Sequence, residues 1–237
     1  MNPKGGCGKT TLSTNLASYF STQGAITTLM DLDAQGSSIF WAHKRPELAN
    51  HIQLVDAHNS PHNVTRSWAI QPPRNTQVLV LDTPARPDLA NLSPLLREAS
   101  AILIPALTNE FDLHAIVNTA QQLQRSLPSQ KNIGLVFNRI NKGLPYKKQT
   151  TMLSKEMALP VIGSLRDSCN YIRAAAKGLG ICEMRGSHYQ TDKLDLIRIA
   201  QWCEAQNEKR DKRKSQKEGT QLLRHIDPDS IILASTA

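Results

Sequence analysis

Short apolar runs alternate with longer amphipathic stretches along most of the 237-residue chain. The runs end in polar or turn residues, which is typical of buried parallel strands, and they cover 26–31, 52–56, 78–82, 101–105, 133–138 and 160–164. The stretches between them carry apolar residues at three- and four-residue spacing, as crossover helices do, for example at 10–23, 111–127 and 146–159. The pattern predicts an α/β fold, a doubly wound and mostly parallel sheet with helices on both faces. Ligands of such sheets bind at the carboxyl ends of the strands.

The pattern changes near Gln206, where the segment NEKRDKRKSQKEG has no apolar face and is followed by a short mixed segment ending in IILASTA. We interpret residues 1–205 as one domain and residues 206–237 as a basic, flexible tail. A helix end followed by loose residues is the simpler interpretation of this tail, and an accessory contact with nucleic acid is the alternative.

Composition indicates which partners and which cellular compartment to expect. Lysine and arginine outnumber aspartate and glutamate by 28 to 20, which favours phosphate-bearing partners. The four cysteines form no CxxC pair, as expected of free thiols in a reducing cytoplasm. No apolar run approaches the roughly 20 residues of a membrane-spanning helix, and the chain does not open with a signal segment. We therefore expect a cytoplasmic protein that does not engage a membrane.

The first residues, MNPKGGCGKTT, resemble a phosphate-binding loop. Gly8, Lys9 and Thr10 fit the end of the pattern G-x-x-x-x-G-K-[ST], whereas Pro3 stands where the first glycine belongs. The stretch does match K-G-G-x-G-K-T-T, a deviant form of the loop that carries a second lysine, here Lys4.

The residue types in this loop are those that bind a nucleoside triphosphate. Its glycines allow successive N–H groups to turn onto phosphate oxygens. Lys9 adds a positive charge near the β- and γ-phosphates, and the Thr10 hydroxyl can ligate Mg²⁺. Cys7 fills the variable position, and we expect no chemical role for its thiol. The predicted ligands of the nucleotide in this loop are Gly5, Gly6, Cys7, Gly8, Lys9, Thr10 and Thr11.

Two further strands end in carboxylates, in DLDAQGSS at 31–38 and VLVLDTPAR at 78–86. Each places a carboxylate at the edge of the sheet where the loop lies. Asp82, after four apolar residues, has the Walker-B arrangement, in which a carboxylate holds magnesium, usually through a water.

These motifs resemble the ParA family of partition ATPases, within the larger group that includes MinD and the nitrogenase iron protein. The resemblance covers roughly residues 1–183 and runs through NPKGGCGKTT, DLDAQGS, LDTPAR, FNRIN at 137–141 and the more diffuse LRDSCNYIRAAAKGLGICE. It implies a P-loop NTPase fold, ATP and Mg²⁺ as cofactors, and an ATP-dependent homodimer. In that dimer Lys4 reaches the nucleotide of the partner while Lys9 serves its own.

The same resemblance assigns roles to other residues. It implies that Asp33 orients the attacking water, that Asp31 belongs to the magnesium shell or to a switch, and that Asn138 contacts the adenine edge. The catalytic set is then Lys4, Lys9 and Asp33. The metal set is Thr10, Asp31 and Asp82.

The resemblance also implies non-specific DNA binding in the ATP state and association with the nucleoid. The candidate DNA-binding residues are Arg166, Arg173, Lys177, Arg185 and Lys193. The leading hypothesis is an ATP-dependent dimerisation switch in plasmid or chromosome partitioning, or in the positioning of another cargo. A ParB-like or other partner protein would stimulate its slow hydrolysis.

One departure from the family leaves alternatives open. Relatives place an apolar strand before the loop, and here only Met1, Asn2 and Pro3 precede Lys4, so we expect a truncated first strand and a natural start upstream, in a segment rich in Ile and Val. A non-catalytic module that binds DNA or protein is the alternative from another class. A membrane-surface ATPase like MinD is less favoured, because Pro228 interrupts the terminal segment that would form an amphipathic helix.

Overall fold

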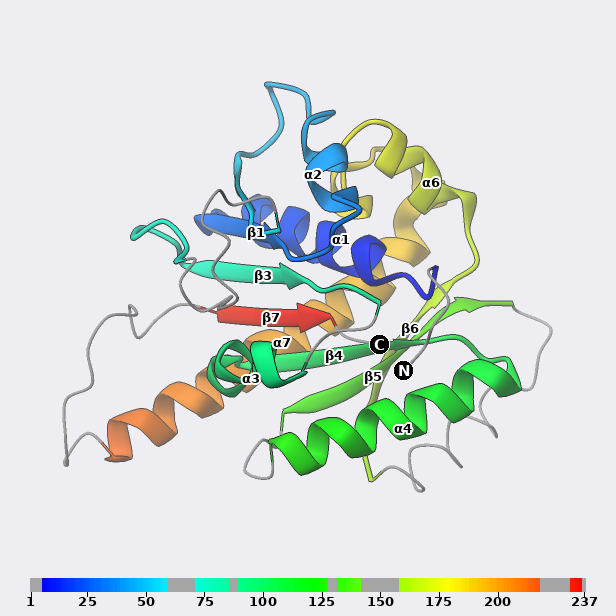
Figure 1. Cartoon of the computed structure of the whole chain (residues 1–237). Coiled ribbons are helices and arrows are strands. Elements are labelled where there is room, and N and C mark those ends of the chain that lie inside the picture. The colour runs from blue at the N-terminus through cyan, green and yellow to red at the C-terminus, as the bar shows by residue number, and fades with distance from the viewer. Residues whose placement is uncertain are drawn as a thin grey trace.

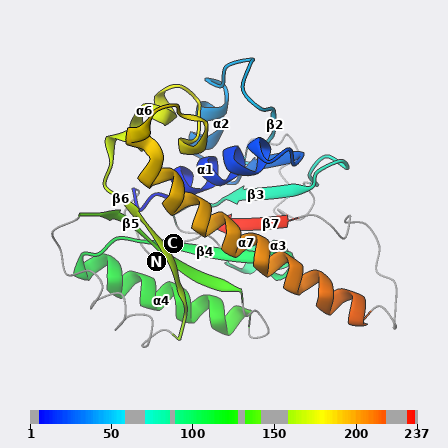
Figure 2. The same cartoon turned by 180° about the vertical axis from the view of Figure 1, so that it is seen from behind.

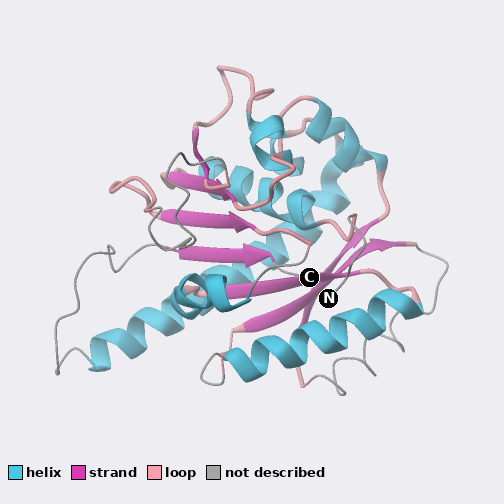
Figure 3. Cartoon of the chain, in the orientation of Figure 1, coloured by secondary structure: helices cyan, strands magenta, loops and turns pink. Residues whose placement is uncertain are grey.

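A computed structural model describes residues 6–58, 71–85, 89–127, 132–141, 158–217 and 231–235 of the chain. Its strands form one seven-stranded sheet in the order β2-β1-β3-β7-β4-β5-β6, and every neighbouring pair is parallel (Figures 1 and 3). The strands are β1 (Thr27–Asp31), β2 (Ile52–Asp56), β3 (Val78–Asp82), β4 (Ala101–Ala106), β5 (Ile133–Ile140), β6 (Val161–Arg166) and β7 (Ile231–Ser235).

Helices cover both faces of this sheet (Figures 1 and 2). The α-helices are α1 (Lys9–Thr22), α2 (Ser37–Ala42), α3 (Leu89–Glu98), α4 (Glu110–Ser126), α6 (Cys169–Ala176) and α7 (Gln190–Lys217). Two short 3₁₀ helices, η2 (Ile181–Glu183) and η3 (Ser187–Tyr189), connect α6 to α7. Among the residues described, no helix is both long and apolar enough to span a bilayer.

The hydrophobic core has two halves, one on each face of the sheet. On one face α1, α2, α6 and α7 pack on the strands through side chains such as Leu16, Trp41 and Leu196. On the other face α3 and α4 pack through Leu96 and Ile116. Strands β3 and β4 are buried along their whole length, which explains why their sequences are continuous apolar runs. The predicted doubly wound α/β fold is confirmed, as are the six strands predicted from the sequence.

The structure differs from the sequence-based prediction beyond residue 205. Helix α7 continues without a break to Lys217, because its first half buries apolar side chains such as Ile199 and Cys203 and the charged half continues the same helix. Residues 231–235, which we assigned to a flexible tail, form the central strand β7. The predicted helix at 146–159 lies almost wholly outside the described residues.

Candidate functional site

The phosphate-binding loop ends at Gly8, where any other residue would strain the backbone. Gly8 has φ +99° and precedes the first residue of α1. A Cβ atom at Gly8 would lie 1.8 Å from Nδ2 of Asn138. Helix α1 begins directly after Gly8, so the N–H groups of its first turn can donate hydrogen bonds to an anion bound at the loop. Lys4 and Gly5 lie outside the described residues, so their predicted roles stay predictions.

Asn138, near the end of β5, is hydrogen-bonded to this loop. Its Nδ2 donates to the carbonyl of Cys7 at 2.8 Å, and its Oδ1 accepts from the backbone N–H of Arg139 at 2.9 Å. The side chain would have to leave Cys7 to contact an adenine. Its predicted contact with adenine stays a prediction, and its observed contact is with the loop.

Lys9 points its charge into the loop. Its side chain is buried, and Nζ donates to Sγ of Cys7 at 3.7 Å, a long contact with a weak acceptor. Within the described ranges this is the contact that Lys9 Nζ makes, and a buried ammonium group with so weak a partner gains most from an anion such as phosphate. This geometry suits the predicted role of Lys9 on the nucleotide.

Asp82, at the end of β3, carries the most unusual electrostatics of the site. Its side chain is buried, Oδ1 accepts from the Ser13 hydroxyl at 3.3 Å, and Oδ2 has no hydrogen-bond partner among the residues that the structure describes. Burial raises the pKa of Asp82 to about 7, and the negative charge of Asp31 adds to that rise, whereas Thr10, Ser13 and Lys9 lower it in part. An unsatisfied carboxylate oxygen beside Thr10 is the environment that a bound divalent cation would complete. The residues present therefore fit Mg²⁺.

A pH dependence of stability follows from this raised pKa. Between about pH 4 and pH 7 the folded chain keeps a proton on Asp82 that the unfolded chain has lost, so the contribution of Asp82 to stability falls as pH rises through this window. We expect Asp82→Asn, without magnesium or nucleotide, to unfold at a higher temperature than the wild type at pH 8 and to lose the difference near pH 4. Thermal melts in a chelating buffer measure this. A wild-type chain that gains no stability relative to Asp82→Asn on acidification would contradict the expectation.

Asp31 and Asp33 are connected by the turn that leads from β1 to α2. Oδ2 of Asp31 accepts from the Ser38 hydroxyl at 2.6 Å and from the N–H groups of Ser38 at 3.1 Å and Ile39 at 3.3 Å. Oδ1 accepts from the N–H of Asp33 at 2.9 Å. Asp31 thus holds this turn and the start of α2, next to its register partner Asp82. Among the described residues, the half-buried Asp33 side chain accepts from the N–H of Gln35 alone, at 3.1 Å, so one carboxylate oxygen remains available to a water.

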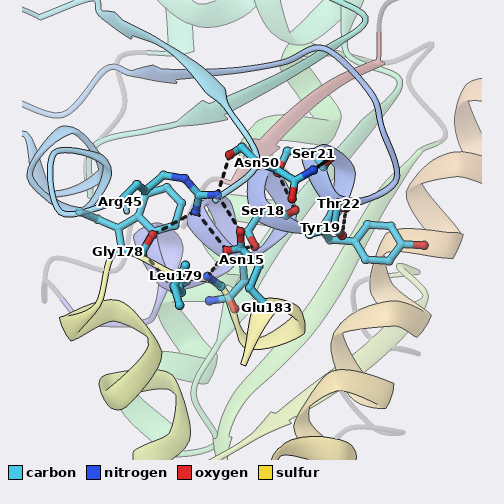
Figure 4. Close-up of polar contacts among 12 residues, drawn as sticks. Asn15, Ser18, Tyr19, Ser21, Thr22, Arg45, Asn50, Gly178, Leu179 and Glu183 are labelled. Atoms are coloured by element: carbon cyan, nitrogen blue, oxygen red, sulfur yellow. Dashed lines mark hydrogen bonds and ion pairs between the residues drawn. The ribbon is translucent and has the colours of Figure 1, made fainter. Parts of the chain in front are cut away.

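A buried polar network that the sequence analysis missed lies behind the loop (Figure 4). Arg45 makes a two-pronged contact with Glu183, at 2.7 Å and 3.1 Å, and both side chains are only 8% exposed. Oε2 of Glu183 also accepts from the Ser18 hydroxyl at 2.6 Å and from the N–H of Gly180 at 2.8 Å. The network ties the segment after α2 and the segment after α6 to the middle of α1.

Asn15 extends this network to the first turn of α1. Its Oδ1 accepts from the N–H of Ile181 at 2.6 Å, and its Nδ2 donates to the carbonyl of Thr11 at 2.7 Å. Asn15 and Ser18, which are buried on the same side of α1, are the signal in the sequence that could have indicated such a network. These contacts hold the helix that carries Lys9 in a fixed position.

A cavity of about 380 Å³ opens beside the start of α1, between α2 and α6. Its walls combine hydroxyl groups of α1 with aromatic and aliphatic side chains, and the lining residues are Thr10, Thr11, Thr14, Asn15, Ser37, Phe40, Trp41, Lys44, Tyr171, Ile172, Ala175 and Ala176. Because Thr10 and Thr11 form one wall, the cavity is continuous with the predicted phosphate site. Asn138 does not line it.

The five basic residues predicted to bind DNA have different surroundings. Arg166 is ion-paired at 2.8 Å with Asp192, whose side chain is fully buried. Arg173 and Lys177, on and just after α6, are exposed, as is Arg185, and Lys193 is half-buried. The structure thus leaves four of the five able to reach a partner, while Arg166 serves the packing of β6 against α7.

Comparison with known proteins shows the family of the chain. Residues 1–181 match the model of the CobQ/CobB/MinD/ParA nucleotide binding domain. The chain is 29% identical over 191 residues to the maintenance of carboxysome distribution protein A of Halothiobacillus neapolitanus, which covers 77% of this chain and 85% of that protein. It is 28% identical over 205 residues to the protein of the same name from Gloeobacter kilaueensis, covering 85% and 90% of the two chains.

Solved structures of the same group share the fold. The MinD cell division protein of Aquifex aeolicus aligns with a TM-score of 0.61 and 14% identity, over 94% of this chain and 98% of that one. The ATP complex of a substituted McdA from Cyanothece aligns with a TM-score of 0.59 and 15% identity, over 95% and 96%. From the matched family model and the loop, carboxylates and sheet described above, the chain belongs to the CobQ/CobB/MinD/ParA family of nucleotide-binding domains.

Proposed function

We propose that this chain is a ParA-like ATPase that dimerises when it binds ATP and so acts as a switch in the positioning of a cargo. The observation that carries the proposal is the buried Oδ2 of Asp82 near Lys9 and Thr10, which finds no hydrogen-bond partner in the described part of the chain. A magnesium ion bound with a nucleotide would supply a ligand partner for the Asp82 oxygen, and the phosphates would supply an anion for Lys9. The two sequence relatives are carboxysome distribution proteins, which supports cargo positioning without restricting the cargo to a plasmid.

In this proposal each residue of the site has a separate role in ATP binding or hydrolysis. The backbone of the Gly6–Gly8 turn and the ammonium group of Lys9 hold the phosphates, and Lys4 reaches the nucleotide of the partner subunit. Thr10 and Asp82 hold Mg²⁺, which when bound supplies charge neutralisation on the phosphate oxygens. Asp33 aligns the attacking water, with Asp31 fixing the turn that positions it. Because most of the catalysis of phosphoryl transfer comes from positioning, the rigid support of α1 and α2 is part of the site.

The proposal is tested by Asp33→Ala together with the wild type. We expect wild-type chain to form a dimer with ATP and Mg²⁺ and to hydrolyse ATP, and Asp33→Ala to dimerise equally well while hydrolysing about 100-fold more slowly. Size-exclusion mass and phosphate release measure the two properties. Glu47→Ala, which removes an exposed carboxylate away from the loop, serves as the control. A wild type that neither dimerises with ATP nor hydrolyses it would favour the non-catalytic binding module instead.

We further propose that the ATP-bound dimer binds DNA without sequence preference, through the exposed cations of α6 and the segment that follows it. Substituting both Arg173 and Lys177 by alanine should weaken DNA binding and reduce the slope of log affinity against log salt by about 2 for each subunit of the dimer that contacts the DNA, because each of the two cations would neutralise one phosphate. Arg198→Ala is the control, because this exposed arginine on α7 lies outside the proposed surface. Titrations of labelled duplex DNA at several salt concentrations measure the slope. An unchanged slope would remove α6 from the DNA surface.

A stimulating partner protein completes the proposed cycle. The dimer would release its cargo when hydrolysis separates the subunits, so the rate of hydrolysis sets the lifetime of the bound state. A ParB-like or other partner would act by accelerating that step.

A further inference from the structure

The cavity beside the start of α1 lies between two helices that expose large apolar side chains. Phe40 on α2 is 64% exposed and Ile172 on α6 is 73% exposed, and both line the cavity. Trp41 and Tyr171, whose side chains are buried, line the same two walls. An exposed apolar patch around a hollow is typical of a surface that binds a partner. We call the cavity with these two walls the α2–α6 groove.

The two walls of the α2–α6 groove are joined to each other at one end. Nη1 of Arg45 donates to the carbonyl of Gly178 at 3.0 Å (Figure 4). Nε1 of Trp41 donates to the carbonyl of Leu179 at 3.3 Å. A Cβ atom at Gly178 would lie 2.4 Å from the backbone nitrogen of Arg45, so the segment after α6 touches the end of α2. A groove whose walls are already fixed loses little conformational entropy when a partner fills it.

The floor of the groove is the outer side of α1, and its polar side chains are already engaged. The Thr14 hydroxyl donates to the carbonyl of Thr10 at 2.7 Å. The Asn15 amide bonds both the N–H of Ile181 and the carbonyl of Thr11. An apolar side chain can therefore lie on this floor without leaving a buried polar group unpaired. The floor suits an apolar occupant better than a polar one.

The charge around the groove is positive. Among the described residues that line it, Lys44 carries the charge, and its Nζ lies 4.1 Å from the centroid of the Phe40 ring. Arg173 and Lys177 are exposed and four positions apart, so they lie on one side of α6. Glu47 is the exposed carboxylate nearest to Lys44 in the sequence, and it leaves these three cations in excess. Carboxylates placed around an apolar centre would complement this rim.

We propose that the α2–α6 groove docks an acidic amphipathic helix of a partner protein. The apolar face of that helix enters the groove between Phe40 and Ile172, and its carboxylates lie against Lys44, Arg173 and Lys177. The walls and the floor of the groove are helices, which offer no strand edge, so an extended segment would leave its backbone groups unpaired there. A helix satisfies its own backbone and presents apolar side chains at three- and four-residue spacing.

The position of the groove connects the docked partner with the nucleotide site. The floor begins at Thr10, and the α2 wall begins at the turn whose Ser38 hydroxyl and N–H bond the carboxylate of Asp31. A partner in the groove therefore contacts both elements that would position magnesium and water. We expect the docked helix to accelerate hydrolysis. This expectation rests on the function proposed above, whereas the docking itself is independent of ATP.

A peptide selection on the full chain, without nucleotide, tests the docking. The probe is a display library of random peptides of about 16 residues, long enough for some four helical turns. We expect the enriched peptides to carry Asp and Glu around large apolar residues at helical spacing. Replacing both Phe40 and Ile172 by serine should weaken the binding of a labelled enriched peptide about 10-fold or more, because two large apolar contacts are lost. Fluorescence anisotropy measures the affinity.

Charge reversal provides a second variant, and matched controls lie outside the groove. Lys44→Glu with Lys177→Glu should weaken peptide binding and reduce its dependence on salt. Ile26→Ser, which removes a 40% exposed side chain at the amino-terminal end of β1, should leave the affinity unchanged. So should Lys209→Glu, which reverses an exposed charge on α7. Melting temperatures of all variants show whether each one is folded.

The outcomes of the selection are distinct. Binding that is lost in both groove variants and kept in both controls supports the proposal. Enriched peptides that are basic, or that bind the Phe40 and Ile172 variant as tightly as the wild type, overturn it, and so does a selection that enriches no peptide. If the chain alone associates in size exclusion and the Phe40 and Ile172 variant does not, the occupant is a second copy of this chain and the choice of partner is wrong.

Phosphate release tests the effect on hydrolysis. We expect the selected peptide to raise the rate of ATP hydrolysis by the wild type several-fold, and the variant with serine at Phe40 and Ile172 to lose this response. If the wild type hydrolyses ATP at the same rate with and without the peptide, the effect on hydrolysis is wrong while the docking stands. If the peptide binds but the wild type hydrolyses no ATP in either condition, the docking stands and the proposed function is wrong.

Discussion

Replacing Gly8 by alanine should abolish ATP binding while the sheet stays folded. The new Cβ would meet Nδ2 of Asn138 at 1.8 Å, and φ at this position is +99°. The positive φ costs about 1–2 kcal/mol for an alanine, and forcing the overlap apart costs a further 1–3 kcal/mol or so. Either the loop or the Asn138 amide that holds Cys7 must shift to relieve the overlap, and a displacement of the loop by about 1 Å is enough to reduce function roughly 100-fold. Titration with a fluorescent ATP analogue measures the loss.

Two further variants separate the clash from the backbone strain. Gly24→Ala also introduces alanine at a positive φ, +87°, but its Cβ would meet no atom within 4 Å and the site is remote. It should lose about 1 kcal/mol of stability and bind ATP normally. Asn138→Ala removes the obstructing amide, so Gly8→Ala combined with Asn138→Ala should recover part of the affinity that Gly8→Ala loses. If Gly8→Ala binds as the wild type does, the close approach of Asn138 is not a constraint on the loop.

Arg45→Ala should produce the largest loss of stability of any single substitution in the polar network. It leaves the carboxylate of Glu183, 8% exposed, without its counter-charge and removes the donor to the carbonyls of Gly178 and Asn50 (Figure 4). Removing one partner of a buried ion pair costs about 3–5 kcal/mol. For a chain of this size that corresponds to a fall in Tm of roughly 6–20 °C. Calorimetry at neutral pH measures it.

The matched control is the pair Arg198–Asp195, which joins at 3.6 Å with the arginine 71% exposed. Arg198→Ala should cost less than about 1 kcal/mol, because water screens an exposed pair. Replacing both Arg45 and Glu183 by methionine should cost less than Arg45→Ala alone, since an apolar pair leaves no buried charge. Equal losses for Arg45→Ala and Arg198→Ala would show that the Arg45 contact is not desolvated in solution.

The parts of the site that the sequence predicted are those with local patterns. Lys9 and Thr10 follow a glycine at fixed spacing, and Asp82 ends a run of four apolar residues, so each could be placed on a loop or a strand end from its neighbours alone. The strands were equally predictable, because burial on both faces leaves a continuous apolar run. These predictions needed no knowledge of which segments pack together.

The parts that the sequence did not predict depend on distant segments. Arg45 and Glu183 are ordinary surface residue types, and only the close approach of the Gly178–Gly180 segment to α1 and to the turn after α2 buries them together. The contact of Asn138 with adenine stays a prediction, and its observed contact with Cys7 depends on the absence of a side chain at Gly8. The segment IILAS has the pattern of a strand, yet its place in the sheet is decided by β3 and β4 and not by its charged neighbours.

The position of β7 also has a consequence for how the chain folds. Its partners β3 and β4 precede it in the sequence, and the pairing of Leu233 with Val80 joins residues that are 153 positions apart. Such non-local pairings slow folding. Until β7 arrives, two neighbouring strands present open edges to other nascent chains, a state prone to aggregation. Helix α1 packs on β7 as well as on β1 and β3, so its packing against the sheet is complete only after β7 has paired.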